Sequence, residues 1–141
     1  MIILDTNVIS ALMRHSPDAE ITAWLDRQPQ ISIWTTSVTV FEIRLGLQVM
    51  ATGKRRVLLT QAFEAWLDRI GERVASFDKL AATQTADLMA LRQREGRPGD
   101  LRDSMIAGIA LARGATLATR NTTHFEDLSV PVVNPWFERK P

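Results

Sequence analysis

IILDTNVI, at residues 2–9, holds a strand, a turn and the start of a helix. Residues 2–4 form a short unbroken apolar run, which is typical of a strand covered on both faces. Asp5 and the two polar residues after it supply turn and N-cap chemistry, and apolar residues then recur at helical spacing from Val8 to Met13. We therefore predict a buried strand that passes directly into a helix, with Asp5 at the junction.

Short strands and helices alternate along the rest of the chain. Apolar runs predict strands at residues 31–34, 74–77, 115–119 and 130–133. Helical spacing predicts helices at residues 17–27, 35–51, 54–70, 78–94 and 100–113, the last rich in small residues that permit close packing on a sheet. This alternation favours an α/β layer fold with a mostly parallel central sheet. Since the sequence has no repeat, linker or low-complexity stretch, we expect one domain over residues 1–141.

The composition is that of an ordinary globular protein, with 141 residues, 45% of them hydrophobic and 23% charged. The chain has no cysteine, which excludes disulfides and thiolate zinc sites. No apolar run approaches the length of a membrane span and no targeting pattern is present, so we expect a cytoplasmic protein without membrane association.

The net charge of +1 gives little long-range attraction for nucleic acid, so a polyanion would have to be held by local basic patches. Two stretches rich in arginine and lysine, at residues 54–56 and 92–102, are the candidates. A solvated surface position is the commoner role for each of these side chains alone.

Asp5 follows a predicted buried strand, so its side chain is expected at the carboxyl edge of the sheet, where α/β proteins bind their ligands. A helix N-cap is an equally good explanation for a single aspartate at this position. Asp5 is therefore a candidate site residue that needs support from other segments.

Glu42 shares a face of the predicted helix 35–51 with Val38, Leu45 and Val49. This places a carboxylate inside an apolar stripe, where an unpaired charge is costly and is matched by an arginine or a cation. Because Arg44 points elsewhere on the helix, the partner is either a distant arginine or a metal ion, and we favour the ion.

Asp103 lies on the same face of the predicted helix 100–113 as the apolar residues Ile106 and Ala110. Its position three residues after Asp100 is also that of a first-turn acid that follows an N-cap and suits the helix dipole. The shared apolar face favours a carboxylate that is turned toward the interior.

Three inward acids from separate segments repel one another unless a cation neutralises them. Oxygen ligands select hard ions, so the sequence predicts an Mg²⁺ or Mn²⁺ site made by Asp5, Glu42 and Asp103. The two histidines, His15 and His124, are expected at surface or loop positions and not as ligands.

A fourth polar side chain, Asn121, follows the predicted strand 115–119 and reaches the same edge of the sheet. Its carbonyl oxygen suits coordination of a metal or a hydrogen bond to a water of the metal. A polar turn residue is an equally good explanation.

Four segments together resemble a known family: residues 3–10 (ILDTNVIS), 39–46 (TVFEIRLG), 103–107 (DSMIA) and 117–125 (LATRNTTHF). In this order and at these separations the chain resembles the PIN-domain ribonucleases, and within them the VapC toxins of type II toxin–antitoxin pairs, most nearly the FitB-like subgroup. The tail at residues 133–136 (VNPW) is similar to the end of that subgroup. The likeness covers essentially the whole chain.

The resemblance implies a three-layer α/β/α PIN-like domain that cleaves single-stranded RNA with Mg²⁺ or Mn²⁺. It implies metal binding by the acids at Asp5 and Asp103, with Glu42 completing the cluster and Asn121 in the catalytic set. It also implies a homodimer and inhibition by a cognate VapB- or FitA-like antitoxin. Several relatives have an aspartate where this chain has Asn121, and often another at His124, so the fourth acid is absent here and the number of bound ions stays open.

Two other functions compete with a toxin ribonuclease: a PIN-type nuclease of RNA processing that has no antitoxin, and a non-catalytic interaction module in which the acids are caps and ion-pair partners. No Walker or dinucleotide glycine motif and no G-x-S-x-G elbow occurs in the sequence, which excludes those chemistries. The helices at 36–51 and 54–70 carry more apolar residues than one buried face requires, among them Leu47, Met50 and Trp66, so part of this surface is expected to be an interface.

Overall fold

The computed structural model describes residues 1–137. Its strands are β1 (Ile2–Leu4), β2 (Ile33–Thr36), β3 (Val74–Ala75), β4 (Thr116–Ala118) and β5 (Val132–Val133). Its helices are α1 (Thr6–Leu12), α2 (Ala19–Asp26), α3 (Ser37–Val49), α4 (Lys54–Ile70), α5 (Lys79–Arg94) and α6 (Leu101–Arg113), with short 3-10 turns η1 (Gln30–Ser32) and η2 (Thr122–Phe125). Among the helices of residues 1–137, none has the length and apolar character that crossing a membrane requires.

The five strands form one parallel sheet in the order β3-β2-β1-β4-β5. The chain builds outward from β1 through β2 to β3 and then returns to the other side of β1 as β4. The direction of winding therefore reverses between β1 and β4, and in open α/β sheets the crevice outside the carboxyl ends of such strands is where ligands bind. This confirms the predicted α/β fold with a parallel central sheet.

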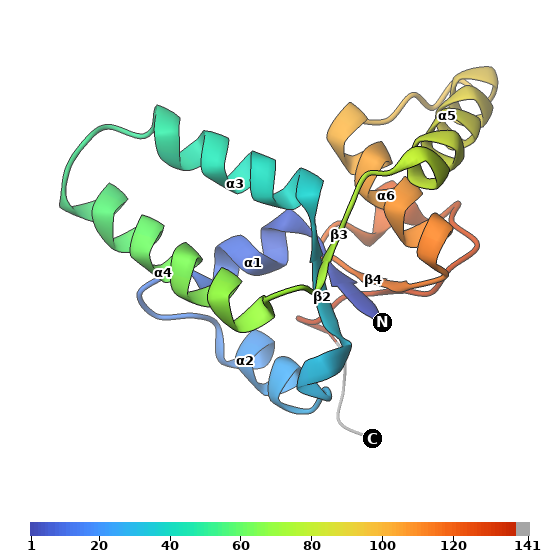
Figure 1. The fold of residues 1–141 in the computed structure, drawn as a ribbon. Helices are drawn as coiled ribbons and strands as arrows, with labels where there is room; N and C mark the ends of the chain where they lie inside the picture. The colour runs from blue at the N-terminus through green and yellow to red at the C-terminus, as the bar shows by residue number, and fades with distance from the viewer. Residues whose placement is uncertain (138–141) are drawn as a thin grey trace.

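Each strand supplies apolar side chains to two separate cores. In β1, Ile3 faces the core that is closed by α5 and α6, whereas Leu4 faces the core formed with α1 to α4. Leu117 and Ala118 of β4 divide in the same way, because successive side chains of a strand point to opposite faces. The result is the predicted arrangement of helices on both sides of the sheet (Figure 1).

The second strand begins later than the sequence indicates. The first half of the predicted strand at 31–34 belongs to the 3-10 turn η1, in which the Ser32 hydroxyl donates to the Pro29 carbonyl at 2.6 Å and Ile31 is 78% exposed. Strand β2 instead runs to Thr36, whose hydroxyl accepts the Thr39 backbone N–H and so caps α3.

The prediction that Glu42 lies in a buried apolar stripe is wrong. The face of α3 that packs on the sheet and α4 carries Val38, Thr39, Ile43 and Leu47. Phe41, Leu45 and Val49 are 56%, 40% and 75% exposed. Both sets recur at helical spacing, and only packing against neighbouring elements selects which one is covered. Leu47 is consequently core and not the interface residue that the sequence indicated.

Small residues in α6 bring it close to another helix as well as to the sheet. A Cβ atom built on Gly108 would lie 1.8 Å from the Thr85 Oγ1 and 2.8 Å from the Ala81 carbonyl oxygen, both in α5. Ala107 and Ala110 are fully buried in the core between α6 and the sheet. The absence of a side chain at Gly108 thus sets the distance between α5 and α6 and, through α6, the position of Asp103.

Candidate active site

Asp5 lies at the point where the winding of the sheet reverses. It follows β1, and its backbone N–H donates to the Ala118 carbonyl at 2.8 Å, which continues the pairing of β1 with β4 by one residue. The hydroxyl of Thr119, the residue after β4, donates to Asp5 Oδ2 at 2.8 Å. Two residues 114 positions apart are thereby joined at the carboxyl edge of the sheet.

Within residues 1–137, the hydrogen bonds to the Asp5 side chain come from neutral donors. Its Oδ1 accepts the Thr6 backbone N–H at 2.8 Å, and its Oδ2 also accepts the Asn7 amide at 3.3 Å. Asp5 is only 3% exposed. A buried carboxylate without a cationic partner is costly, so this residue is more than the N-cap that the sequence left as an alternative, although it does cap α1.

Burial raises the pKa of Asp5 from 3.8 to about 6. The hydrogen bonds from Thr119 and Thr6 lower this pKa, whereas the charges of Asp103 and Glu42 raise it further. Both carboxylates therefore lie within electrostatic reach of Asp5. The fold thus places the carboxylates of three segments near the same edge of the sheet, although within residues 1–137 they do not surround a common point.

Glu42 reaches the edge of the site from α3. Its Oε1 accepts the Thr6 hydroxyl at 2.8 Å, and the Thr6 oxygen lies 3.2 Å from the Thr39 hydroxyl. Its Oε2 lies 3.7 Å from Arg102 Nη1, and the Glu42 side chain is 20% exposed. Of the two partners that the sequence left open, an arginine is therefore present, although at a distance beyond a hydrogen bond.

Asp103 enters the site from the first turn of α6. The Asp100 side chain caps this helix by accepting the Asp103 backbone N–H at 3.0 Å, which leaves the Asp103 carboxylate free of a capping role. The Asp103 side chain is 26% exposed, and its Oδ2 lies 3.3 Å from the His124 Nδ1. His124 lies at an exposed position, as expected, and its side chain also contacts one of the three acids.

Contacts with other side chains hold the carboxylates of Glu42 and Asp103 apart from a common point. Across residues 1–137 no three acids or histidines surround one point closely enough to hold a metal ion in the conformation described. Glu42 is turned toward Thr6 and Arg102, and Asp103 toward His124. Both side chains are partly exposed, whereas Asp5 is fixed.

Asn121 is exposed at the end of β4, and its backbone N–H donates to the Thr119 hydroxyl at 3.0 Å. Thr119 thus links Asn121 to Asp5. The Asn121 side chain makes no hydrogen bond with any of residues 1–137 that meets ordinary criteria. Its main chain belongs to the site, and a role for its amide stays a prediction.

A buried ion pair supports the side of the site that carries Asp103 and His124. The Arg92 guanidinium donates to both carboxylate oxygens of Asp127 at 2.8 Å and to the His124 carbonyl at 2.9 Å. It also lies 3.2 Å from the Ser104 hydroxyl, next to Asp103. Arg92 is 4% exposed, so the expectation of a solvated surface arginine is wrong for this residue.

Sequence reasoning missed the neutral residues that orient the acids. Thr6 and Asn7 stand directly after Asp5, where the sequence pattern indicates only turn and N-cap chemistry. Thr119 gives no comparable signal, because only the pairing of β4 with β1 places it beside Asp5. Arg92 looks in the sequence like any other arginine of a basic stretch.

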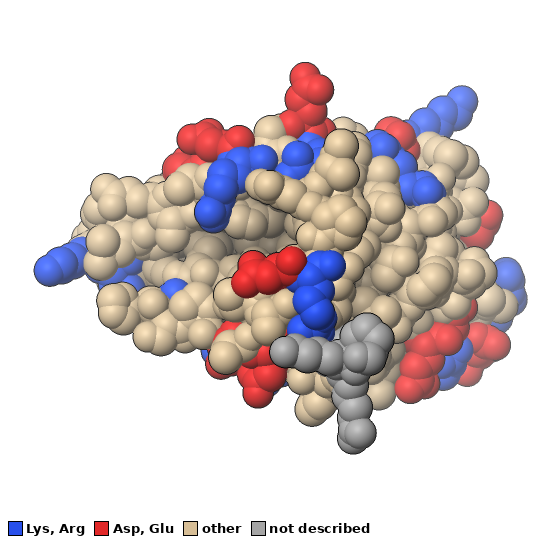
Figure 2. All heavy atoms as spheres, turned by 90° about the horizontal axis from the view of Figure 1, so that it is seen from below, with Lys and Arg blue, Asp and Glu red and all other residues tan. Residues whose placement is uncertain are grey.

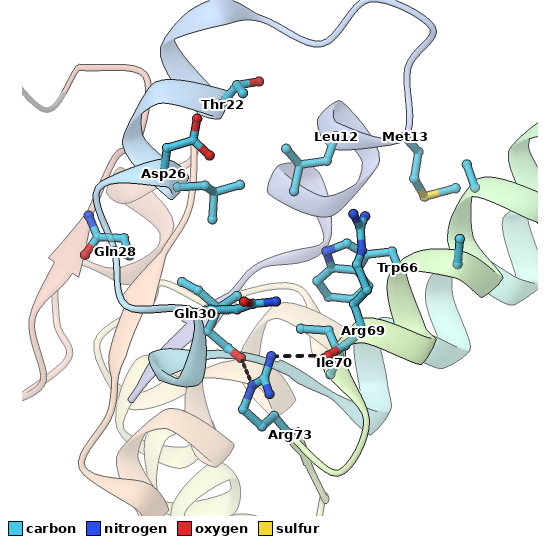
Figure 3. Close-up of a pocket in the computed structure, with 14 residues that line it drawn as sticks. Leu12, Met13, Thr22, Asp26, Gln28, Gln30, Trp66, Arg69, Ile70 and Arg73 are labelled. Carbon is cyan, nitrogen blue, oxygen red and sulfur yellow. Dashed lines mark hydrogen bonds between the residues drawn. The ribbon is translucent and has the colours of Figure 1, made fainter.

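One large cavity lies away from these acids. It measures about 610 Å³ and opens between α1, α2 and α4, with Leu12 and Met13 facing Trp66 across it (Figure 3). Arg73 closes one end by donating to the Ile33 carbonyl at 2.8 Å (Figure 3). On the face drawn in Figure 2, basic and acidic side chains are interspersed, and no broad surface of one sign is present there.

The chain is similar to known proteins over nearly its whole length. The PIN domain model matches residues 2–130. The chain is 40% identical over 137 residues to VapC ribonuclease Y4jK of Sinorhizobium fredii, which covers 96% of this chain and 98% of the relative. It is 34% identical over 139 residues to toxin FitB of Neisseria gonorrhoeae, which covers 98% and 100%. The crystal structure of FitAcB from Neisseria gonorrhoeae superposes with a TM-score of 0.90 at 34% identity, with 98% and 100% of the two chains covered.

These matches span nearly the whole chain and confirm the resemblance that the four sequence segments indicated. This protein belongs to the PIN-domain family.

Proposed function

We propose that this protein is a metal-dependent endoribonuclease that cleaves phosphodiester bonds in single-stranded RNA and acts in the cytoplasm as the toxin of a type II toxin–antitoxin pair. The observation that carries the proposal is that the charges of Glu42 and Asp103, from two other segments, act on the buried Asp5 at the carboxyl edge of the sheet, where the winding reverses between β1 and β4. Relatives named as a ribonuclease and as a toxin support the same activity.

Mg²⁺ or Mn²⁺ suits these side chains. In the part of the chain that the structure describes, Asp5 has neutral hydrogen-bond donors and two further carboxylates within electrostatic reach, so a divalent cation would relieve a buried charge that these hydrogen bonds offset only in part. Asp5, Glu42 and Asp103 would hold the ion once Glu42 and Asp103 release Arg102 and His124. When bound, the ion supplies charge neutralisation at the phosphate and activation of water.

The neutral residues of the site prepare Asp5 for this role. Thr119, Thr6 and Asn7 fix the direction of its carboxylate, so it does not need to reorient when a cation arrives. Asn121 stands beside Thr119 and offers a neutral amide in place of a fourth acid. Three carboxylates are better suited to holding one ion tightly than to holding two ions.

A VapB- or FitA-like antitoxin and a second copy of the chain are the proposed partners. Support comes from large apolar side chains that α3 and α4 leave exposed to solvent, since contiguous exposed apolar surface marks interaction sites. These exposed residues are Phe41, Leu45, Val49, Val57 and Leu58. Size-exclusion chromatography with light scattering, on the chain alone and with its antitoxin, measures both associations.

The decisive experiment is cleavage of a panel of cellular RNAs by the purified chain with Mg²⁺ or Mn²⁺, beside an EDTA control. We expect Asp5→Asn and Asp103→Asn to abolish cleavage while the fold persists. Asp87→Asn, at an exposed acid of α5, is the matched control and should cleave like the natural chain. Metal-dependent cleavage by a purified Asp5→Asn variant would contradict the assignment.

Two other functions remain as alternatives. A PIN-type nuclease of RNA processing would cleave RNA in the same way but would have no antitoxin, and a gene for a small DNA-binding protein directly upstream distinguishes the two. A non-catalytic interaction module would use its acids only as caps and ion-pair partners. Absence of any rise in the melting temperature with Mn²⁺ would favour the module.

A further inference from the structure

A second concave region adjoins the acidic site on the side of α6. This Asp103 pocket, of about 370 Å³, lies between the start of α6, the end of α5 and η2, and its lining includes Asp103, Arg97, Thr123 and His124. Asp103 and His124 are shared with the acidic site described above. If one phosphate of a polynucleotide lies at these acids, the adjacent nucleotide would therefore lie at the mouth of this pocket.

The inner wall of the Asp103 pocket is rigid. It is formed by the buried Arg92–Asp127 pair, in which two hydrogen bonds of 2.8 Å hold the guanidinium in one orientation. Gly99 packs against this guanidinium so closely that a Cβ atom would lie 2.9 Å from Arg92 Nη1. Since these groups are already fixed, a ligand that enters the pocket does not have to order them.

The rim of the pocket carries two flat, polar side chains. The side chains of Arg97 and His124 are 55% and 56% exposed. Arg97 is held only at the rim, 3.1 Å from Glu95 and 3.7 Å from Asp127. Guanidinium and imidazole planes are surfaces on which unpaired RNA bases stack, and a hydroxyl group, here that of Thr123, can hydrogen-bond to the edge of a base.

We propose that the Asp103 pocket binds the base of the nucleotide next to the cleaved phosphate of single-stranded RNA, with Arg97 as its main contact. This inference rests on the proposed ribonuclease function. The volume is within the roughly 300–1,000 Å³ of small-ligand sites. Only an unpaired base has the free face and edge that such a pocket requires, so the pocket selects single strands.

The other two cavities fit a base less well. The 610 Å³ cavity between α1, α2 and α4 shares no residue with the acids. A third, of about 400 Å³, adjoins the site through Arg102 but is walled by the apolar side chains of Phe41, Phe77 and Met105. The Asp103 pocket alone among these three combines an acid of the site with polar groups at its rim.

The test compares Arg97→Ala with Arg94→Ala, a neighbouring exposed arginine that does not line the pocket. The substrate is an RNA oligonucleotide that the natural chain cleaves. A second set of substrates has the same sequence, but each lacks one base near the cleaved bond. We expect Arg97→Ala to raise KM at least about fivefold while kcat changes less than twofold. Arg94→Ala should change neither.

Removing one particular base beside the cleaved bond should raise KM of the natural chain by a similar factor, and should add little to the effect of Arg97→Ala because both remove the same contact. Thr123→Trp, which fills the pocket from η2, should also raise KM. The pocket proposal is overturned if the RNA is cleaved but neither Arg97→Ala nor Thr123→Trp changes KM. It is also overturned if the effects of base removal and of Arg97→Ala on KM are additive. If the natural chain cleaves no RNA with Mg²⁺ or Mn²⁺, the proposed function itself fails.

Discussion

The Thr119 hydroxyl donates to Asp5 Oδ2 at 2.8 Å and at the same time accepts the Asn121 backbone N–H at 3.0 Å. One side chain thus orients the buried acid of the site and fixes the loop that follows β4. Because β1 and β4 are adjacent parallel strands, the end of one meets the end of the other, and the hydroxyl spans the gap between them.

Loss of this hydroxyl should impair catalysis more than stability. Thr119→Val keeps the shape of the side chain but removes the donor to Asp5 and the acceptor for Asn121, which costs about 1–3 kcal/mol of unfolding free energy. We expect RNA cleavage to fall by at least about tenfold, since Asp5 loses its orientation. Thr119→Ser retains the hydroxyl and should restore most of the activity. Equal cleavage by the valine and serine variants would count against an orienting role.

Asp5 should make the metal-free protein less stable as the pH rises. Its pKa is about 6 in the folded chain against 3.8 as the ordinary value, so the folded state binds this proton more tightly than the unfolded state does. The resulting penalty is absent below pH 4, grows between pH 4 and 6, and is complete above pH 7, where it reaches at most about 3 kcal/mol.

Asp5→Asn removes this charge. In EDTA we expect the variant to be more stable than the natural chain at pH 8 and nearly equal to it at pH 4, as measured by urea unfolding at both pH values. Asp87→Asn, at an exposed acid, should show no such difference between the two pH values. A stability change of Asp5→Asn that is the same at both would contradict the burial penalty.

The ion pair between Arg92 and Asp127 should contribute far more than an exposed pair. The side chains of Arg92 and Asp127 are 5% and 14% exposed, so Asp127→Asn leaves a buried guanidinium without its counter-charge and should cost about 3 kcal/mol or more. Glu64→Gln breaks the pair with Arg44, in which both side chains are nearly half exposed, and should have a much smaller effect because solvent screens this pair. Chemical denaturation of both variants measures the difference, and similar losses would contradict the structural role of Arg92.

Two glycines that both lie inside helices should differ in how substitution by alanine changes the stability of the protein. Gly108→Ala forces a methyl group into the Thr85 side chain and the Ala81 carbonyl and should destabilise the protein by about 3 kcal/mol. Gly46→Ala in α3 meets no atom within 4 Å and should stabilise by about 0.5–1 kcal/mol through helix propensity. Thermal unfolding of both variants separates them, and a stable Gly108→Ala protein would show that α5 and α6 are less closely packed than described.

The exposed apolar side chains of α3 should matter for association and not for folding. Val49 is 75% exposed, and Val49→Glu should weaken dimer formation or antitoxin binding while the melting temperature changes by only a few degrees. Leu80→Glu, at a 54% exposed apolar residue of α5, is the control and should associate normally. Light scattering that gives the same mass for the natural chain and Val49→Glu, together with unchanged antitoxin affinity, would exclude this surface as an interface.

The sequence alone determined the order and kind of the main elements and the identity of the acids. Its strands and helices are short and bounded by prolines, glycines and capping residues, so local patterns predict them: the helix at 54–70 is found as predicted, and Asp78 and Asp100 cap the helices that follow them. Asp5 could be named because it directly follows a buried strand, and the carboxyl ends of such strands are where α/β proteins bind their ligands.

Only the tertiary structure decided which face of α3 is buried, which neutral side chains orient Asp5, and that Arg92 and His124 support the site. These features depend on contacts between residues far apart in the chain, such as Thr119 with Asp5 and Arg92 with Asp127. The spacing of apolar residues and the helix or strand propensity of each residue are local properties. They do not distinguish an arginine that is exposed to solvent from one that is buried. The strand order β3-β2-β1-β4-β5 brings these partners together, and that order is set by packing over the whole chain.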